Sequence, residues 1–217
     1  MLSKYEIRKF IEKFDSPIIL QIGVGFPDDT LEFISVFDDL DFQLWAFEPD
    51  PRNIDQFRKT INDPRVRLVD GAIGNIDGKI QFNVSPGDTR LSGSLKEPGD
   101  DLYKIWPDIF KDMEFPKIEV ECMKLDTICK YCDELSFVFA DVQGAEDLMI
   151  EGGIDTFTNK VHYLYTEYSN SEIYQDEPNL DKILSMLPDY EIVQLYKNSG
   201  KGDLSGGDVL LRNRRFV

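Results

Sequence analysis

Hydrophobic positions in the first third of the chain alternate between helical and strand-like spacing. Ile7, Phe10, Ile11 and Phe14 recur three and four residues apart, which predicts an amphipathic helix over residues 3–14. The nearly all-apolar run at 18–22 predicts a strand that is covered on both faces of its sheet. The same alternation predicts a helix that starts at Asp28 or Asp29, a strand at 42–47, a helix at 51–60 and a strand at 66–69. Such alternation indicates parallel strands joined by right-handed crossovers, so the predicted fold class is α/β.

The pattern changes in the middle of the chain and then returns. Asp77-Gly78, followed by an apolar stretch at 80–84, predicts a β-hairpin. Further on, the sequence predicts strands at 118–122, 137–140 and 161–165, a helix that begins at Asp126 and a helix at 180–187. The last two predicted strands, 191–196 and 208–212, are separated by a loop with Gly200, Gly202, Gly206 and Gly207, which indicates an antiparallel hairpin. No repeat or linker divides residues 1–217, so we expect one domain with an N-terminal helical segment at 1–16.

Residues 85–117 stand apart from the regular alternation. They hold four of the eleven prolines and one short helical pattern at 102–110. A long irregular segment within a compact domain is usually functional. We therefore expect an insertion or lid over a binding site.

Composition and charge limit the classes of partner. The chain has 24 basic and 41 acidic residues, a net charge of −17. Such a surface repels phosphate backbones and anionic lipids, so nucleic acid and membranes are not expected as partners. No apolar run approaches the ~18–20 residues that span a bilayer. The charged N-terminus has no secretory pattern, and Cys122, Cys129 and Cys132 are too few for a disulfide framework, so a cytoplasmic protein is expected.

Candidate ligand-binding residues lie at the carboxyl ends of the predicted strands, where open parallel sheets bind ligands. Gly23 and Gly25 follow the first strand, and Glu48 ends the next one about 20 residues later, where an acidic side chain can accept hydrogen bonds from ribose hydroxyls. Asp28 and Asp29 occupy the helix start that would hold a dinucleotide pyrophosphate. Their charge favours S-adenosylmethionine, which carries a sulfonium and an ammonium, over NAD.

Several short segments resemble those of one enzyme family. Residues 46–53 read A-F-E-P-D-P-R-N, residues 71–78 read G-A-I-G-N-I-D-G, and residues 140–146 read A-D-V-Q-G-A-E. Together with Leu125-Asp126 and Tyr165-Thr166-Glu167, they are similar to the motifs of FkbM-type S-adenosylmethionine-dependent methyltransferases. The resemblance covers about residues 18–212.

The resemblance implies a Rossmann-like class I methyltransferase fold with about seven strands. It also implies O-methyl transfer to a hydroxyl of a sugar, a glycan or a sugar-bearing small metabolite. Carried over to this sequence, it implies that the donor is held by Gln21, Gly23, Gly25, Glu48, Pro49, Asp70, Gly71 and Ala72. Among these, Gln21 would accept a hydrogen bond from the donor ammonium, Glu48 would hold the ribose, and residues 70–72 would lie beside the adenine.

Three positions depart from the family pattern. Gln21 stands in place of an aspartate, Pro27 in place of a glycine, and Gln143 in place of a glutamate. These departures leave open a catalytically impaired module that binds S-adenosylmethionine. An NAD-dependent oxidoreductase is the less favoured alternative, because the first turn lacks the third glycine of that fingerprint.

Methyl transfer to a hydroxyl needs a base near the strand ends. Asp141 is the first candidate, with Glu167 and Glu146 behind it. Asp141 could instead cap the turn that follows it, and Glu146 could only complement the dipole of a helix start. The single histidine, His162, lies in an apolar strand and is interpreted as structural. The three cysteines and this histidine do not make a zinc site, so no metal is expected.

Acceptor recognition is assigned to the irregular segment and its surroundings. Aromatic faces combined with hydroxyl and guanidinium groups suit a sugar. The candidate contacts are Arg90, Ser92, Ser94, Tyr103 and Trp106. Tyr103 and Trp106 could equally serve only to anchor this segment on the domain.

Overall fold

A seven-stranded sheet forms the centre of the fold in this computed structural model, which describes residues 2–197 and 206–216. Its strands are β1 (Ile18–Ile22), β2 (Gln43–Glu48), β3 (Val66–Asp70), β7 (Leu135–Ala140), β8 (Val161–Ser169), β9 (Tyr190–Lys197) and β10 (Gly206–Asn213). They lie in the order β3-β2-β1-β7-β8-β10-β9. The first five in this order are parallel, and β10 is antiparallel to both β8 and β9. The α/β class and the C-terminal antiparallel hairpin are thus confirmed, while Gly200 and Gly202 lie outside the described residues.

Helices cover both faces of this sheet. The first face carries α1 (Lys4–Ile11), α2 (Asp28–Val36) and α3 (Pro51–Thr60), and the second carries α6 (Leu125–Ile128), α7 (Glu146–Glu151), α8 (Ile154–Asn159) and α9 (Leu180–Met186). Side chains of a strand alternate between the faces, so Ile19 packs in the same cluster as Phe33 of α2, whereas Leu20 packs with Met149 of α7. The helix predicted at 3–14 is shorter, and α8 was not predicted.

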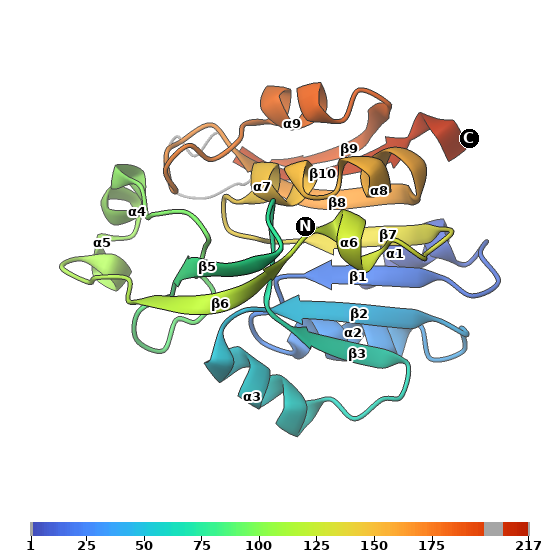
Figure 1. Ribbon diagram of the computed structural model, residues 1–217, viewed down its shortest axis with the longest axis horizontal. Coiled ribbons are helices and arrows are strands. Elements are labelled where there is room, and N and C mark those ends of the chain that lie inside the picture. Colours follow the sequence, from blue (N-terminus) through green and yellow to red (C-terminus); the bar gives the residue numbers. More distant parts are fainter. Residues whose placement is uncertain (1, 198–205, 217) are drawn as a thin grey trace.

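A second, three-stranded sheet lies beyond the carboxyl ends of β1 and β2 (Figure 1). It contains β4 (Ala72–Ile73), β5 (Gly78–Asn83) and β6 (Lys117–Met123) in the order β4-β6-β5. The hairpin predicted at Asp77-Gly78 is wrong, because β6 lies between the two strands that this turn joins. The Asp77 carboxylate accepts hydrogen bonds from the Lys124 N–H at 3.0 Å and the Thr127 hydroxyl at 2.7 Å. The turn is therefore fixed to the end of β6.

The segment between β5 and β6 is the predicted insertion. It carries two short helices, α4 (Asp100–Ile105) and α5 (Pro107–Phe110), which replace the single helical pattern expected at 102–110. Leu102, Phe110 and Phe115 form a small apolar cluster of their own. Figure 1 shows both helices at the end of the molecule to which β1 and β2 point. The segment thus reaches the side of the sheet where the candidate site residues lie.

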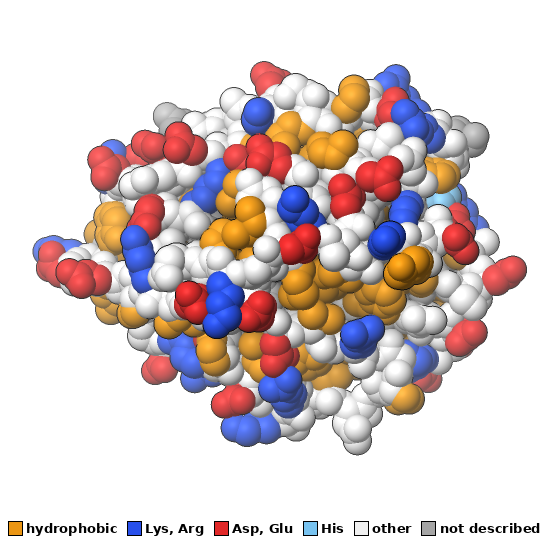
Figure 2. All heavy atoms as spheres, viewed as in Figure 1, with side chains coloured by type: hydrophobic (Ala, Val, Ile, Leu, Met, Phe, Trp, Pro, Cys, Tyr) orange, Lys and Arg blue, Asp and Glu red, His pale blue; other side chains and the backbone are white. Residues whose placement is uncertain are grey.

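Charged side chains are spread over the visible surface, as expected for a chain with 24 basic and 41 acidic residues. In the face drawn in Figure 2, acidic and basic side chains are interspersed around patches of apolar surface. Among the described residues, no helix has both the length and the apolar character needed to cross a lipid bilayer. The chain closes with a short 3-10 helix, η1 (Arg214–Phe216).

Candidate active site

A cavity of about 860 Å³ opens at the carboxyl ends of β1, β2, β7 and β8. Its wall is completed by residues 89–93, by Leu95 and by side chains of α4 and α5. The strand order reverses between β1 and β7, and such reversals mark the ligand sites of open parallel sheets. At this point the Gly23 N–H donates to the Phe47 carbonyl at 3.0 Å, and the Asp141 N–H donates to the Ile22 carbonyl at 2.9 Å. Three strand ends are thereby held side by side.

Glycine is required where β1 ends. Gly23 has a φ of +81°, and a Cβ atom built on it would lie 1.9 Å from the Asp141 carbonyl oxygen. Gly25 has a φ of +58°, and a Cβ atom there would lie 2.6 Å from the side chain of Leu91. Any other residue would be strained at both positions. At these two positions the turn therefore presents backbone rather than side chains to the cavity.

Glu48 lies in the cavity wall with its carboxylate turned to the backbone. Its Oε2 accepts hydrogen bonds from the N–H groups of Val24 at 3.0 Å and Gly25 at 2.8 Å. Its Oε1 accepts one from the Asp50 N–H at 2.8 Å and a longer one from Asn53 Nδ2 at 3.4 Å. Burial raises the pKa of Glu48 to about 7 against the effect of these donors. Glu48 thus connects the turn after β1 with the turn after β2.

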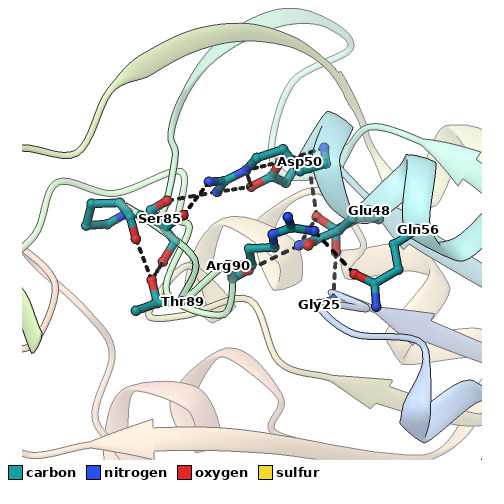
Figure 3. Close-up of polar contacts among 11 residues, drawn as sticks. Gly25, Glu48, Asp50, Gln56, Ser85, Thr89 and Arg90 are labelled. Atoms are coloured by element: carbon teal, nitrogen blue, oxygen red, sulfur yellow. Dashed lines mark hydrogen bonds and ion pairs between the residues drawn. The ribbon is translucent and has the colours of Figure 1, made fainter.

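The irregular segment is fastened to the same turn (Figure 3). The Arg52 guanidinium forms an ion pair with Asp50 at 2.6 Å and donates to the Ser85 carbonyl at 2.8 Å. Asn53 Nδ2 donates to the Arg90 carbonyl at 3.1 Å. Residues 85–90 are therefore held over the ends of β1 and β2 by side chains from the start of α3.

Asp141 ends β7 and lies in a chain of hydrogen bonds. Gln143 Nε2 donates to Asp141 Oδ1 at 2.6 Å. The Tyr174 hydroxyl lies 2.9 Å from Gln143 Oε1 and 3.1 Å from the Ser92 carbonyl, so it can donate to either. Gln143 has a φ of +53°, a conformation that non-glycine residues seldom adopt. The backbone thus turns sharply at Gln143 and aims its amide back at Asp141.

Three acidic side chains share this part of the cavity. Burial raises the pKa of Asp141, and the hydrogen bond from Gln143 opposes the rise. The pKa of Glu167 lies well above its ordinary value, chiefly because the charge of Asp141 is nearby. Burial raises the pKa of Glu146 to about 8. Perturbed carboxyl groups gathered in one cavity are typical of an active site.

Comparison with known proteins identifies the family. A model of the methyltransferase FkbM domain matches residues 20–192 of the chain. The 2-O-methyltransferase NoeI of Sinorhizobium fredii is 35% identical over 97% of this chain and 85% of its own length. The chain belongs to the FkbM methyltransferase family. As a member of this family it is an enzyme that uses S-adenosylmethionine as its methyl donor, which replaces the alternative of an NAD-dependent oxidoreductase.

Solved structures share the FkbM fold more distantly. The methyltransferase FkbM from Methylobacillus flagellatus has a TM-score of 0.56 and 18% identity, over 91% of this chain and 44% of that chain. A putative S-adenosylmethionine-dependent methyltransferase from Listeria monocytogenes has a TM-score of 0.55 and 8% identity, over 96% of both chains. These similarities confirm the predicted class I methyltransferase fold.

Most of the residues singled out in the sequence line the cavity. These are Gly23, Gly25, Glu48, Pro49, Gly71, Ala72, Arg90, Ser92, Trp106, Asp141, Glu146 and Glu167. They come from segments far apart in the chain, and the strand ends bring them together. Arg90 also has a positive φ, +53°, which directs its carbonyl to Asn53.

Four expected site residues do not line the cavity. Gln21 is fully buried behind it, where its Oε1 accepts a hydrogen bond from the Thr30 hydroxyl at 2.7 Å. Asp70 pairs with Arg58 at 2.7 Å on the exposed side of β3. Ser94 donates to the Gln143 carbonyl at 2.7 Å. Tyr103 packs against the apolar cluster of the α4–α5 segment, which fits its alternative role as an anchor.

Two cavity residues escaped sequence reasoning. Tyr174 and Glu177 lie in the loop between β8 and α9 and reach the cavity from above the end of β8. The loop is polar, and its hydrophobic residues follow neither helical nor strand-like spacing. The one sequence signal that could have located it is its position after the predicted strand that ends near Glu167. Gln143 was noted as a departure from the family pattern, whereas the structure shows it in contact with Asp141.

The remaining candidates lie away from the cavity. His162, at the start of β8, lies against the Glu134 carboxylate and stacks on Phe216 with ring centroids 4.1 Å apart. This fits the structural interpretation of the histidine. The three cysteines are free thiols. Within residues 2–197 and 206–216, no group of three or more His, Cys, Asp or Glu side chains is placed to hold a metal ion.

Proposed function

We propose that this enzyme transfers the methyl group of S-adenosylmethionine to a hydroxyl of a sugar or of a small sugar-bearing metabolite. The proposal is supported by the 35% identity to a 2-O-methyltransferase over nearly the whole chain. The observation that carries the proposal is Asp141, a carboxyl group that lines the cavity at the end of β7 and whose pKa is raised by burial. A hydroxyl must lose its proton as it attacks the methyl group, and a carboxylate of raised pKa is suited to accept it.

The donor half of the proposed site is the turn after β1 together with the ends of β2 and β3. Its cavity-lining residues are Gly23, Gly25, Glu48, Pro49, Gly71 and Ala72. The two glycines leave room for a ligand against the backbone, and Glu48 supplies the carboxylate for the ribose hydroxyls. In the present contacts Glu48 already accepts from four donors, so we expect the ribose to displace the longest of them, from Asn53 at 3.4 Å.

In the proposed mechanism Asp141 is the base. S-adenosylmethionine supplies an electrophilic methyl group on its sulfonium. Asp141 accepts the proton of the acceptor hydroxyl while the oxygen bonds to the methyl carbon and the carbon–sulfur bond breaks. Holding the oxygen in line with the methyl group contributes to the rate as well. Gln143 fixes the Asp141 carboxylate by a hydrogen bond to Oδ1, so that the other oxygen is left for the acceptor.

Glu167 and Glu146 are proposed to bind the acceptor rather than to deprotonate it. Both line the cavity, and both have raised pKa values. Ser92 and Trp106 complete the proposed acceptor contacts from the segment between β5 and β6. Arg90, the other candidate of this segment that lines the cavity, donates to Gln56 of α3 and is assigned to the donor half. A cytoplasmic location remains part of the proposal, in line with the three free thiols.

A catalytically impaired binding module is the alternative function. The sequence supports this alternative at Gln21, Pro27 and Gln143, the three positions that depart from the family pattern. The contacts weaken that support, because Gln21 lies behind the cavity on Thr30 and Gln143 holds the proposed base. Pro27 is the residue immediately before α2 and makes no side-chain hydrogen bond there. None of the three substitutions takes away a proposed contact with the acceptor.

The two functions are separated by a pair of measurements on the purified chain. Calorimetry with S-adenosylhomocysteine tests the donor site, and transfer of a labelled methyl group to a panel of glycosides tests catalysis. We expect binding and label transfer to at least one glycoside. Binding without transfer to any glycoside in a broad panel would instead favour the impaired module.

A further inference from the structure

The acidic side chains of the cavity differ in how their charge is balanced. In the donor half, Asp29 is paired with Lys4 at 2.5 Å and Asp50 with Arg52 at 2.6 Å. The Lys4 side chain is itself almost fully buried and lies over the ring of Phe139, with its ammonium 4.4 Å from the ring centroid. The charge of these two acids is thus cancelled locally, whereas Asp28 and Glu48 line the same half without an ion pair among the described residues.

The acceptor half has no such balance. Four acids line it, namely Asp141, Glu146, Glu167 and Glu177. In the described part of the chain none of the four forms an ion pair. Lys96 approaches this side, but its ammonium is bonded to Asp147 at 2.8 Å and it does not line the cavity. The four carboxyl groups therefore line this half with no ion-paired cation among the described residues.

Glu146 provides a second and independent observation. Its side chain is 2% exposed and lines the cavity, and its Oε1 has no hydrogen-bond partner among the described residues. A buried carboxyl oxygen without a donor is unfavourable. The unpartnered oxygen suits the hydroxyl group of a sugar, which can donate to it when Glu146 is ionised and accept from it when Glu146 is protonated.

The electrostatics of the cluster exclude an additional anion. The pKa of Glu167 is raised first by Asp141 and also by Glu146, Asp208 and Glu177, so these groups already repel one another. Protonation of some of them relieves this repulsion but supplies no positive charge. Arg90 is the one cation that lines the cavity within the described residues, and it belongs to the segment fastened over the donor half, where it donates to Gln56. A phosphate in the acceptor half would therefore stay uncompensated.

We propose that the acceptor subsite of Asp141, Glu146, Glu167 and Glu177 takes an uncharged sugar, free or in glycosidic linkage, and rejects sugar phosphates and sugar nucleotides. This inference rests on the proposed methylation of a sugar hydroxyl. In a reaction sequence, the enzyme then acts after the step that removes the activating phosphate from the sugar. The class of reaction that supplies its substrate is then glycosyl transfer, which releases the nucleoside diphosphate.

The test compares matched acceptors with the wild-type chain. Each sugar of a panel is offered as its methyl glycoside, as its 1-phosphate and as its nucleoside diphosphate derivative, with labelled S-adenosylmethionine at fixed ionic strength. We expect kcat/KM to be at least about tenfold higher for the glycoside than for either phosphorylated form. Raising the salt concentration should narrow this ratio, because screening weakens repulsion between charges. Equal or faster methylation of a phosphorylated form overturns the inference while leaving sugar methylation intact.

A variant pair assigns the selectivity to the cluster. Assayed at pH 9, above the pKa of about 8 that burial gives Glu146, Glu146→Gln keeps the size of the side chain and removes one charge. We expect it to raise KM for the glycoside and to lower the glycoside-to-phosphate ratio by about threefold or more. Glu151→Gln is the matched control, since Glu151 lies on the same helix with its carboxylate bonded to Asn75 outside the cavity. An unchanged ratio in Glu146→Gln contradicts the role of the cluster. A third outcome is that S-adenosylhomocysteine binds but no glycoside, sugar phosphate or sugar nucleotide is methylated. That outcome contradicts the proposed methylation of sugars and therefore also this inference.

Discussion

Gln143 Nε2 lies 2.6 Å from Asp141 Oδ1, and this contact sets the protonation of the proposed base. An amide N–H stabilises the carboxylate form of Asp141 and opposes the rise in pKa that burial causes. The family pattern has a glutamate at this position, which would place a second carboxyl group beside Asp141. The departure is therefore compatible with an active enzyme and predicts a particular pH dependence.

Gln143→Glu should move the acidic limb of the kcat/KM profile to higher pH. A carboxylate beside Asp141 raises the pKa of Asp141, so the base is deprotonated only at higher pH. At pH 6 we expect a loss of activity of about tenfold, with partial recovery at pH 8 to 9. Gln81→Glu, on the exposed face of β5, is the charge-matched control. If kcat/KM of Gln143→Glu is lower at every pH but its acidic limb stays at the same pH, Gln143 has only a structural role.

Glu48→Ala should weaken the binding of S-adenosylhomocysteine by about 1.5–3 kcal/mol, because hydrogen bonds to a charged group are lost. The substitution also removes the acceptor that holds the N–H groups of Val24 and Gly25. Asp70→Ala is the comparison, since Asp70 pairs with Arg58 and does not line the cavity. Calorimetry should show a change within about twofold for Asp70→Ala. Equal affinities in both variants and the wild type would rule out the ribose assignment of Glu48.

Glu146→Gln should stabilise the fold at alkaline pH. The pKa of Glu146 rises from 4.5 to about 8 on burial, so the folded protein holds a proton that the unfolded chain releases. The resulting loss of stability is absent below pH 4.5, grows as the pH rises toward 8 and is complete above it. We expect the variant to exceed the wild type by at least about 1 kcal/mol at pH 8.5 and to match it near pH 5.

Urea unfolding at the two pH values measures this difference. Glu151→Gln serves again as the control, because Glu151 is exposed. A stability difference between Glu146→Gln and the wild type that is the same at both pH values would mean that the carboxyl group does not titrate as its burial requires.

The sequence predicted the sheet well because its buried strands are distinctive. Residues 18–22 and 137–140 are nearly all-apolar runs between turn residues, and they form adjacent strands at the centre of the sheet. The helix at 51–60 was placed correctly by the proline at its first position. The hairpin at Asp77-Gly78 failed because the local signal cannot show that Asp77 bonds to Lys124 and Thr127, far away in the sequence.

The site was predictable at the strand ends and less so elsewhere. Glu48 and Asp141 were found because the residue that ends a parallel strand lies at the ligand-binding edge. Gln21 is one residue earlier than the end of β1, and the alternation of the strand turns it toward α2 and Thr30. Tyr174 is absent from every periodic pattern, so only the packing of its loop against the strand ends brings it to the cavity.

The central claim is that Asp141 accepts the proton of a sugar hydroxyl during methyl transfer. The measurement that tests it most directly is the rate of labelled methyl transfer to a glycoside by the wild type and by Asp141→Asn, together with their affinities for S-adenosylhomocysteine. The amide keeps the shape of the side chain but cannot accept the proton. We expect the rate to fall by about 100-fold or more while the affinity changes by less than about threefold. Transfer at the wild-type rate by Asp141→Asn would contradict the claim.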